Sequence, residues 1–376
     1  MNSIHELALN VKSEQPWNAQ PAVEELIKHP LTPEDLMYCR NHCPVKSIDA
    51  STFTIRVDGS DGLIQRTLEY TLSELKSEFE KVELVAALQC AGNRRKQMAE
   101  KKHQEVEGLK WETGTICNVR WGGVRMRDIL LRAEVQMAED DRRGMEGLHL
   151  NFASHVTACE EADWFRGSIP LAKAMDQEGD VLLAYECNGR PLSVDHGYPF
   201  RVVVPGITGV RWVKWVQRIT VSRQESDNFY QKEDYKVLPP DVSQDSQTSE
   251  RRIMVARLPP LQSNTLNSVI AVATLTPDNK HVHAKGYAIP GSSGQVKTVE
   301  VSTDEGQPWL PAMIVYQEGN WSWTLWEVNI EIGERRPRTV LSRAVDESGN
   351  VQKMDGEVQW NLRGIGYDAV DEKSLV

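Results

Sequence analysis

The stretch that decides the fold is Val82-Glu-Leu-Val-Ala-Ala-Leu-Gln-Cys90-Ala-Gly-Asn-Arg-Arg-Lys96. It begins as a short apolar run, which is typical of a buried strand, and its Gly92-Asn93 pair predicts a turn. Cys90 therefore lies at a strand end, directly before three cations. Fixed cations favour the thiolate, which makes Cys90 a candidate metal ligand or nucleophile. A buried structural cysteine is the alternative, because most free cysteines behave as small hydrophobes.

Composition limits the classes of function. The chain has 376 residues, with 43 Lys and Arg against 54 Asp and Glu and a formal net charge of −11. This size allows two domains, and the acidic balance argues against a nucleic-acid partner. No apolar run approaches the ~20 residues of a membrane span, and neither a signal-peptide pattern nor a peroxisomal Ser-Lys-Leu ending is present. We expect a soluble intracellular protein with no membrane partner.

The cysteines are spread thinly. They are Cys39, Cys43, Cys90, Cys117, Cys159 and Cys187. This spacing lacks the density of a disulfide framework, so we expect reduced thiols. A zinc site at Cys39, His42 and Cys43 is disfavoured because no second Cys/His pair follows at finger spacing.

Local patterns predict several further elements. Thr32 is expected to cap a short helix that opens with Pro33, and Thr71 and Glu74 form a capping box. Asn188-Gly189 predicts a hairpin turn. The other predicted elements are an extended arm at 1–30, strands within 52–70, a charged loop at 97–110, a helix starting at 126–131, a surface loop at 135–147 and a strand at 181–185.

A second basic stretch follows the hairpin turn. It carries His196, Arg201, Arg211 and Lys214 around a turn bounded by Gly206 and Gly209. Fixed donors, together with glycines that allow close backbone approach, suit a buried phosphate. A hairpin with solvated basic residues is the alternative interpretation.

The pattern changes after a polar link at 239–250. Short strands separated by turns follow, which predicts an immunoglobulin-like β-sandwich and domains at 1–245 and 250–376. The predicted strands are 269–275, 281–289, 298–302, 322–330 and 339–345, with turns at 304–306 and 346–350. His281 and His283 lack a third metal ligand and are expected to be exposed.

The string Leu88-Gln-Cys90-Ala-Gly-Asn-Arg-Arg95 resembles the signature of the sulfite oxidase family of molybdenum enzymes. Five further stretches resemble the family and follow its order: Arg40-Asn41-His42, 118–124, 195–215, Asp234-Tyr235-Lys236 and 360–364. The resemblance implies an α+β molybdopterin-binding domain with mixed sheets, the sulfite-oxidase fold. It also implies that the following immunoglobulin-like domain forms a homodimer.

The resemblance also implies roles for single residues. Cys90 is the one protein ligand to a molybdenum held by molybdopterin. The residues implied at the pterin and its phosphate are His42, His196, Arg201, Arg211 and Lys214. Those implied at the substrate are Arg40, Arg95, Trp111, Tyr235 and Arg363. The reaction that the resemblance implies is the two-electron oxidation of sulfite to sulfate. The arginines suit these anions, because guanidinium groups stay charged and bind small oxyanions through paired hydrogen bonds.

The chain departs from the family at a few positions. Glu107 stands where the family commonly has Lys or Arg, so it should point away from the anion pocket, or Lys101 or Lys102 should substitute. Trp212 replaces a frequent serine, and no cofactor role is expected of its side chain. Residues 365–368 replace the usual aromatic and basic ending.

Two other functions stay open. One is the molybdenum domain of a nitrate reductase, although the nitrate reductases that resemble this chain tend to carry Met at the position of Arg363. The other is a diverged, non-catalytic molybdenum-cofactor-binding protein. The chain shows no His-Pro-Gly-Gly haem motif, as in the haem-free plant type. We therefore expect an external electron acceptor, either oxygen or a cytochrome c-like protein, and a cytoplasmic or mitochondrial intermembrane-space location.

Overall fold

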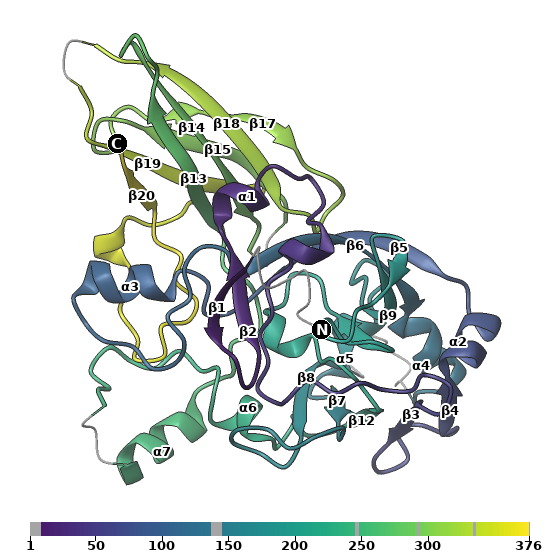
Figure 1. Cartoon of the computed structure of the whole chain (residues 1–376). Helices are drawn as coiled ribbons and strands as arrows, with labels where there is room; N and C mark the ends of the chain where they lie inside the picture. Colours follow the sequence, from purple (N-terminus) through teal and green to yellow (C-terminus); the bar gives the residue numbers. More distant parts are fainter. Residues whose placement is uncertain (1–8, 137–144, 245–247, 292–293, 334–335, 376) are drawn as a thin grey trace.

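A computed structural model describes residues 9–136, 145–244, 248–291, 294–333 and 336–375. Figure 1 shows an α+β body, drawn in purple to teal, from which a pair of sheets in green to yellow projects. No helix in the described part of the chain has both the length and the apolar character needed to cross a membrane.

The first sheet of the body contains the stretch that opens the sequence analysis. Its strands β10 (Arg190–Pro191), β9 (Leu182–Cys187), β6 (Ile116–Arg125) and β5 (Val82–Gln89) lie in that order, and β11 (Arg201–Val203) also pairs with β9. The last five residues of β5 are all buried, as expected for a strand covered on both faces. The predicted strand at 82–88 and the hairpin turn at Asn188-Gly189 are confirmed.

The second sheet is mixed. Its order is β4 (Leu68–Thr71), β3 (Thr54–Gly59), β12 (Arg218–Ser222), β7 (His149–Ser154) and β8 (Phe165–Pro170), and only β3 and β12 run parallel. Short helices α2 (Leu72–Glu78), α4 (Met126–Arg132) and α5 (Leu171–Met175) connect the two sheets. One continuous apolar core joins both sheets, and it includes Val57, Val119, Trp121 and Phe152. The predicted strands within 52–70 and the helix at 126 are confirmed, and so is the capping box of Thr71 and Glu74.

The arm at 1–30 is more structured than predicted. It contains a hairpin of β1 (Leu9–Ser13) and β2 (Asn18–Pro21), followed by α1 (Val23–Leu26). The predicted helix cap at Thr32 is wrong. Its hydroxyl accepts a hydrogen bond from the amide of Asn118 at 2.9 Å, so it is not free to cap the 3₁₀ helix Glu34–Leu36.

The predicted charged loop at 97–110 is wrong in its first half. Residues Arg95–Lys102 form α3, which begins directly after Arg94 adopts a left-handed backbone with φ of 67°. Only Met98 of this helix is buried, so its sequence carries little apolar periodicity to reveal it. The predicted surface loop at 135–147 falls largely outside the described residues.

The C-terminal part is the predicted β-sandwich of two antiparallel sheets. One sheet has the order β13 (Asn267–Leu275), β14 (His281–Ile289), β18 (Thr324–Glu331), β17 (Met313–Tyr316). The other has the order β16 (Leu310–Pro311), β15 (Val296–Ser302), β19 (Thr339–Asp346), β20 (Asp371–Ser374). His281 and His283 are half-buried rather than exposed, and His283 Nδ1 lies 2.7 Å from the Asn329 amide oxygen.

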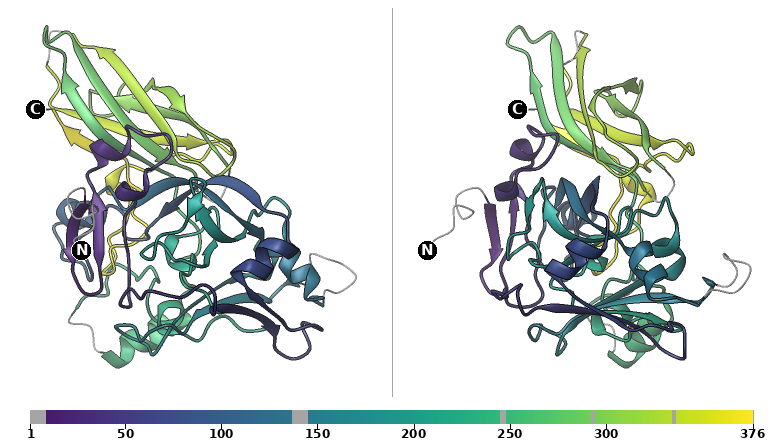
Figure 2. Two further views of the ribbon diagram at one scale, coloured as in Figure 1. Left: turned by 45° about the vertical axis from the view of Figure 1, so that its right-hand side comes forward. Right: turned by 90° about the vertical axis from the view of Figure 1, so that its right-hand side faces the viewer.

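Apolar packing and one buried ion pair join the sandwich to the body, and both views in Figure 2 show the two parts in contact. Leu26 and Ile116 of the body pack with Tyr287 and Trp323 of the sandwich. Arg94, fully buried after the turn that follows Cys90, donates to Asp371 of β20 at 3.1 Å. The same guanidinium donates to the Asn267 side chain and to the Ala369 carbonyl, both at 2.7 Å.

We predict that Arg94→Met destabilises the protein by about 3–5 kcal/mol, because Asp371 would keep a buried charge without its partner. Urea unfolding followed by circular dichroism measures the change. Arg94→Met combined with Asp371→Asn removes both charges and should recover part of the loss. A double variant no more stable than the single one would contradict the electrostatic explanation.

Candidate functional site

A cavity of about 80 Å³ lies beside the end of β5. It is lined by residues from segments far apart in the chain. Among them are Arg40, His42, Cys43, Cys90, His196, Arg201, Lys214 and Tyr235. The structure therefore brings together seven of the eleven predicted site residues, all except Arg95, Trp111, Arg211 and Arg363.

Cys90 is presented by a tight turn. Its backbone amide donates to the Thr115 carbonyl at 3.0 Å, and the Gly92 amide donates to its sulfur at 3.4 Å. A Cβ at Gly92 would lie 3.0 Å from both the Arg95 guanidinium and the Trp111 ring, so only glycine fits this turn without displacing either side chain. A thiol held rigidly at a cavity wall can serve as a ligand for a soft metal.

Two cations of the cavity wall, the buried Arg201 and the half-buried Lys214, have no counter-charge among the described residues. Arg201 is 3% exposed, donates to the His196 carbonyl at 3.0 Å and lies 4.8 Å from the Trp121 ring. Its Nε has no hydrogen-bond partner. Lys214 donates to the Asp195 carbonyl and to the Asn41 amide oxygen, and burial lowers its pKa to about 8. Ion pairs between either cation and a carboxylate are absent from the described residues. Such a site requires an anion.

Arg40, His42 and Tyr235 form a hydrogen-bonded chain. Arg40 Nη2 lies 3.0 Å from His42 Nδ1, and His42 Nε2 lies 2.7 Å from the Tyr235 hydroxyl. Because a guanidinium can only donate, Nδ1 accepts and Nε2–H donates to Tyr235. Burial, followed by the charge of Arg40, holds the pKa of His42 well below its usual range. His42 is thus neutral, and its 3.4 Å approach to the Glu160 carboxylate is not an ion pair.

Tyr235 itself adopts an uncommon backbone conformation. It follows α6 (Phe229–Lys232), has φ of 45° and accepts a backbone hydrogen bond from Leu261 at 2.8 Å. Non-glycine residues in this region are often found at functional sites. Burial raises the pKa of the Tyr235 phenol well above its ordinary value, so the hydroxyl remains protonated.

Three predicted site residues, Arg95, Trp111 and Arg211, lie behind the cavity wall. Arg95 donates to the Leu109 carbonyl at 3.0 Å, and Trp111 is fully buried against Gly92 with its Nε1 unpartnered. Arg211, in the 3₁₀ helix Gly209–Arg211, donates to the carbonyls of Tyr230 and Leu261 at 3.0 and 3.3 Å. Burial lowers the pKa of Arg211 to about 10.

Arg363 faces a different cavity. It donates to the Asp234 carboxylate at 2.7 Å and to the Glu233 carbonyl at 2.8 Å. Trp212, from which we expected no cofactor role, lines the first cavity, and its Nε1 donates to the Ile207 carbonyl at 2.9 Å.

Glu107 has a partner that the sequence did not suggest. It accepts two hydrogen bonds, at 2.9 and 2.6 Å, from Arg251 of α7 (Thr248–Arg257). The expectation that Lys101 or Lys102 could serve the anion pocket is wrong. Lys101 pairs with Glu372, and Lys102 pairs with Asp355 at 3.0 Å.

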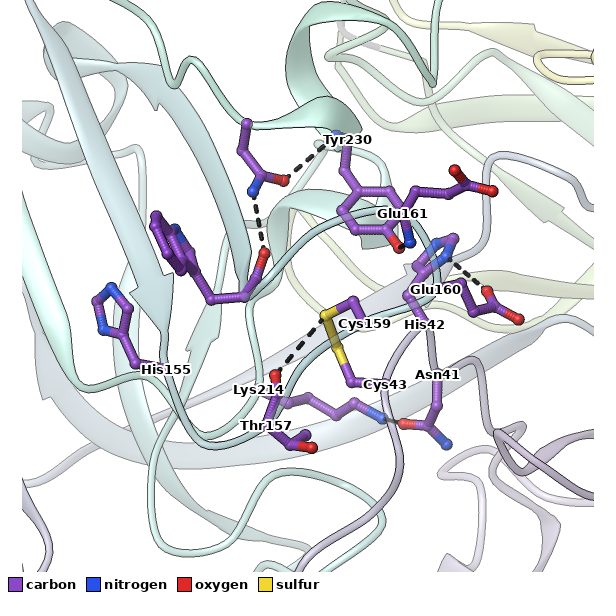
Figure 3. Close-up of a disulfide and its surroundings, with 12 residues drawn as sticks. Asn41, His42, Cys43, His155, Thr157, Cys159, Glu160, Glu161, Lys214 and Tyr230 are labelled. Atoms are coloured by element: carbon purple, nitrogen blue, oxygen red, sulfur yellow. Dashed lines mark hydrogen bonds and ion pairs between the residues drawn. A yellow bond between two sulfur atoms is a disulfide. The ribbon is translucent and has the colours of Figure 1, made fainter.

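The expectation of reduced thiols is wrong for two cysteines. Cys43 and Cys159 form a disulfide with their Cα atoms 4.1 Å apart, while Cys39, Cys90, Cys117 and Cys187 are free. The pair is separated by 116 residues, so no local pattern could reveal it. The disulfide joins the loop between β7 and β8 to the segment that carries His42 (Figure 3). In the same place the Glu160 amide donates to the His42 carbonyl at 3.0 Å.

Comparisons with known proteins give a consistent result. The model for the oxidoreductase molybdopterin binding domain matches residues 42–230, and the Mo-co oxidoreductase dimerisation domain matches 262–369. Sulfite oxidase of Gallus gallus is 39% identical over 95% of this chain and 75% of its own length. Sulfite oxidase of Arabidopsis thaliana is 36% identical over 95% of this chain and 91% of its own length. The chain spans 64% of the sulfite oxidase of Mus musculus.

Two further similarities are more distant. A nitrate reductase of Hordeum vulgare is 34% identical over 96% of this chain but only 41% of its own length. The crystal structure of the sulfane dehydrogenase SoxCD from Paracoccus pantotrophus has a TM-score of 0.76 at 23% identity. The structural match covers 98% of this chain and 89% of the SoxCD chain, and it confirms the predicted fold class.

We predict that replacing both Cys43 and Cys159 with Ser lowers the free energy of unfolding by ~4 kcal/mol, because a 116-residue loop loses its closure. Urea unfolding measures the loss. Reductant should reproduce the loss in the unaltered protein and leave the Ser variant unchanged. A reductant effect of equal size in both would contradict the assignment.

We also predict that stability falls as the pH drops below about 6.5, the ordinary histidine pKa. The unfolded chain takes up the His42 proton while the folded site, with its lowered pKa, does not. His42→Gln should therefore reduce the pH slope by up to about 1.4 kcal/mol per pH unit in urea unfolding experiments. Above neutral pH the free energies of unfolding of the two proteins should change with pH in the same way. An unchanged slope below pH 6.5 would contradict the prediction.

Proposed function

The chain belongs to the sulfite oxidase family of molybdopterin-binding oxidoreductases, and we propose that it oxidises sulfite to sulfate. One observation supports this most strongly: a rigid thiol, cations without counter-charge and a protonated tyrosine converge on one cavity. The nitrate reductase alternative has weaker support, because that relative is 34% identical and this chain covers 41% of it.

The residues of the cavity fit the family's cofactor, molybdenum bound by molybdopterin. Cys90 would ligate the metal. The guanidinium of Arg201, whose Nε has no partner, and the half-buried ammonium of Lys214 suit the phosphate of the pterin, and His42 and His196 line the same cavity. When bound, this cofactor supplies oxygen transfer to sulfur and accepts the two electrons. Arg211, whose two terminal nitrogens already have partners, supports the surrounding backbone.

Tyr235 and Arg40 would position the substrate. The Tyr235 oxygen accepts from His42, so its own O–H remains available to donate to an oxyanion. Arg40 lines the same cavity, and its hydrogen-bond partners Asn18, Asn41 and His42 supply no carboxylate to offset its positive charge. A cationic cavity in a chain of net charge −11 would also draw anions toward it.

Arg95 and Trp111 lie behind the wall of the first cavity and would affect the site through Cys90 and its turn. Arg95 is half-buried and donates to the carbonyls of Gly364 and Leu109, so its charge adds to the positive field at Cys90. Trp111 packs against Gly92 and supports the turn that presents Cys90.

We propose a division into a molybdopterin-binding domain at 1–245 and a sandwich domain at 250–376 that forms a homodimer; the matched family models support both parts. The exposed apolar side chains of β17, Met313 and Val315, suit such a contact. Electrons would pass to an external acceptor, oxygen or a cytochrome c-like protein. The disulfide favours the mitochondrial intermembrane space over the cytoplasm, which keeps thiols reduced.

The test is sulfite-dependent reduction of ferricyanide by the purified, molybdenum-loaded protein, with viologen-driven nitrate reduction measured beside it. We expect turnover with sulfite and none with nitrate. Cys90→Ala should lose sulfite turnover and retain the circular dichroism spectrum, because the thiol is the proposed metal ligand. Turnover with nitrate alone, or full activity in Cys90→Ala, would overturn the proposal.

A further inference from the structure

Four side chains of alternating charge lie in a row at the edge of the site: Asp234, Arg363, Glu107 and Arg251. Arg363 donates to Asp234 at 2.7 Å and lies 4.0 Å from the Glu107 carboxylate. Arg251 binds both oxygens of that carboxylate, at 2.9 and 2.6 Å. The row has no net charge. Its four members come from four segments of the chain, and all four have side chains only 16–31% exposed.

The row borders a second cavity of about 590 Å³. Charged side chains dominate its lining: Lys232, Glu233, Lys236, Arg251, Arg252 and Arg363. Lys236, which lines the second cavity, directly follows Tyr235, which lines the first. Five cations against one acid give the second cavity a positive potential that attracts small anions.

Arg363 is one of the cations that line the second cavity. Its Nη1 pairs with Asp234, its Nη2 donates to the Glu233 carbonyl, and its Nε has no hydrogen-bond partner. Glu107 is a second carboxylate that could bind this guanidinium. At 4.0 Å its carboxylate is beyond hydrogen-bond distance of Arg363, because both of its oxygens bind Arg251.

We propose that Arg251 is a positioning residue for the oxyanion substrate: by holding Glu107 in a two-point ion pair, it keeps Arg363 available to the anion. The identity of the anion as sulfite rests on the proposed function. In this chain an acid stands where the resembled family commonly has a cation. An arginine from α7 restores the charge balance at that point.

The test is a double-mutant cycle in the molybdenum-loaded enzyme. In Arg251→Ala the freed carboxylate should turn to Arg363, so KM for sulfite should rise roughly five- to thirty-fold while kcat changes little. Glu107→Gln alone should leave KM unchanged or lower it. The double variant should return KM to near the starting value, because it lacks both the unpaired carboxylate and its partner.

Arg252→Ala gives a matched control. It removes one cation from the same helix and the same cavity, but not from the Glu107 pair, so its KM change should be small. A merely structural role of Arg251 would lower the melting temperature without rescue by Glu107→Gln. That result, or an unchanged KM in Arg251→Ala, would overturn the inference.

A second readout does not depend on turnover. Sulfate should raise the melting temperature of the enzyme less in Arg251→Ala than in the unaltered protein or in Arg252→Ala. If sulfite turnover fails but this order of sulfate stabilisation holds, the proposed function is wrong and the role of Arg251 stands. Equal stabilisation in all three proteins would overturn the role of Arg251, whatever the turnover.

Discussion

The constraint on which the site depends is the burial of positive charge without a neighbouring carboxylate. Arg201 is buried and Lys214 is half-buried, their donors point at carbonyls and an amide, and burial lowers the pKa of both. Folding alone does not repay that desolvation. An anionic cofactor does, which explains why an acidic chain keeps cations in its interior and places its carboxylates elsewhere.

The turn after Cys90 connects the cavity to the sandwich. Gly92 makes room for Arg95 and Trp111, and the left-handed Arg94 sends its guanidinium away from the cavity to Asp371 of β20. The metal-ligand candidate is thus held from two directions, by the body and by the sandwich. This buried pair gives the C-terminal part a structural role in the site in addition to its role in the proposed dimer.

Two contacts hold the periphery of the site together. The Cys43–Cys159 disulfide holds the β7–β8 loop against the segment of His42 and so stabilises the hydrogen-bonded chain to Tyr235. The pair of Glu107 and Arg251 ties α7 to the edge of the second cavity. Both link segments more than 100 residues apart. The site is therefore built by long-range contacts around a short local motif.

The sequence alone determined the strand that ends in Cys90, the sandwich and the family, because apolar periodicity, turn residues and an ordered set of motifs are local properties of a chain. It also named the seven residues that line the first cavity. Only the tertiary structure decided that Arg211 supports carbonyls, that Arg363 faces a second cavity, that Glu107 meets Arg251 and that Cys43 meets Cys159. The physical reason is the same in each case: the partner of a buried charge or thiol is set by spatial proximity, which sequence spacing does not encode.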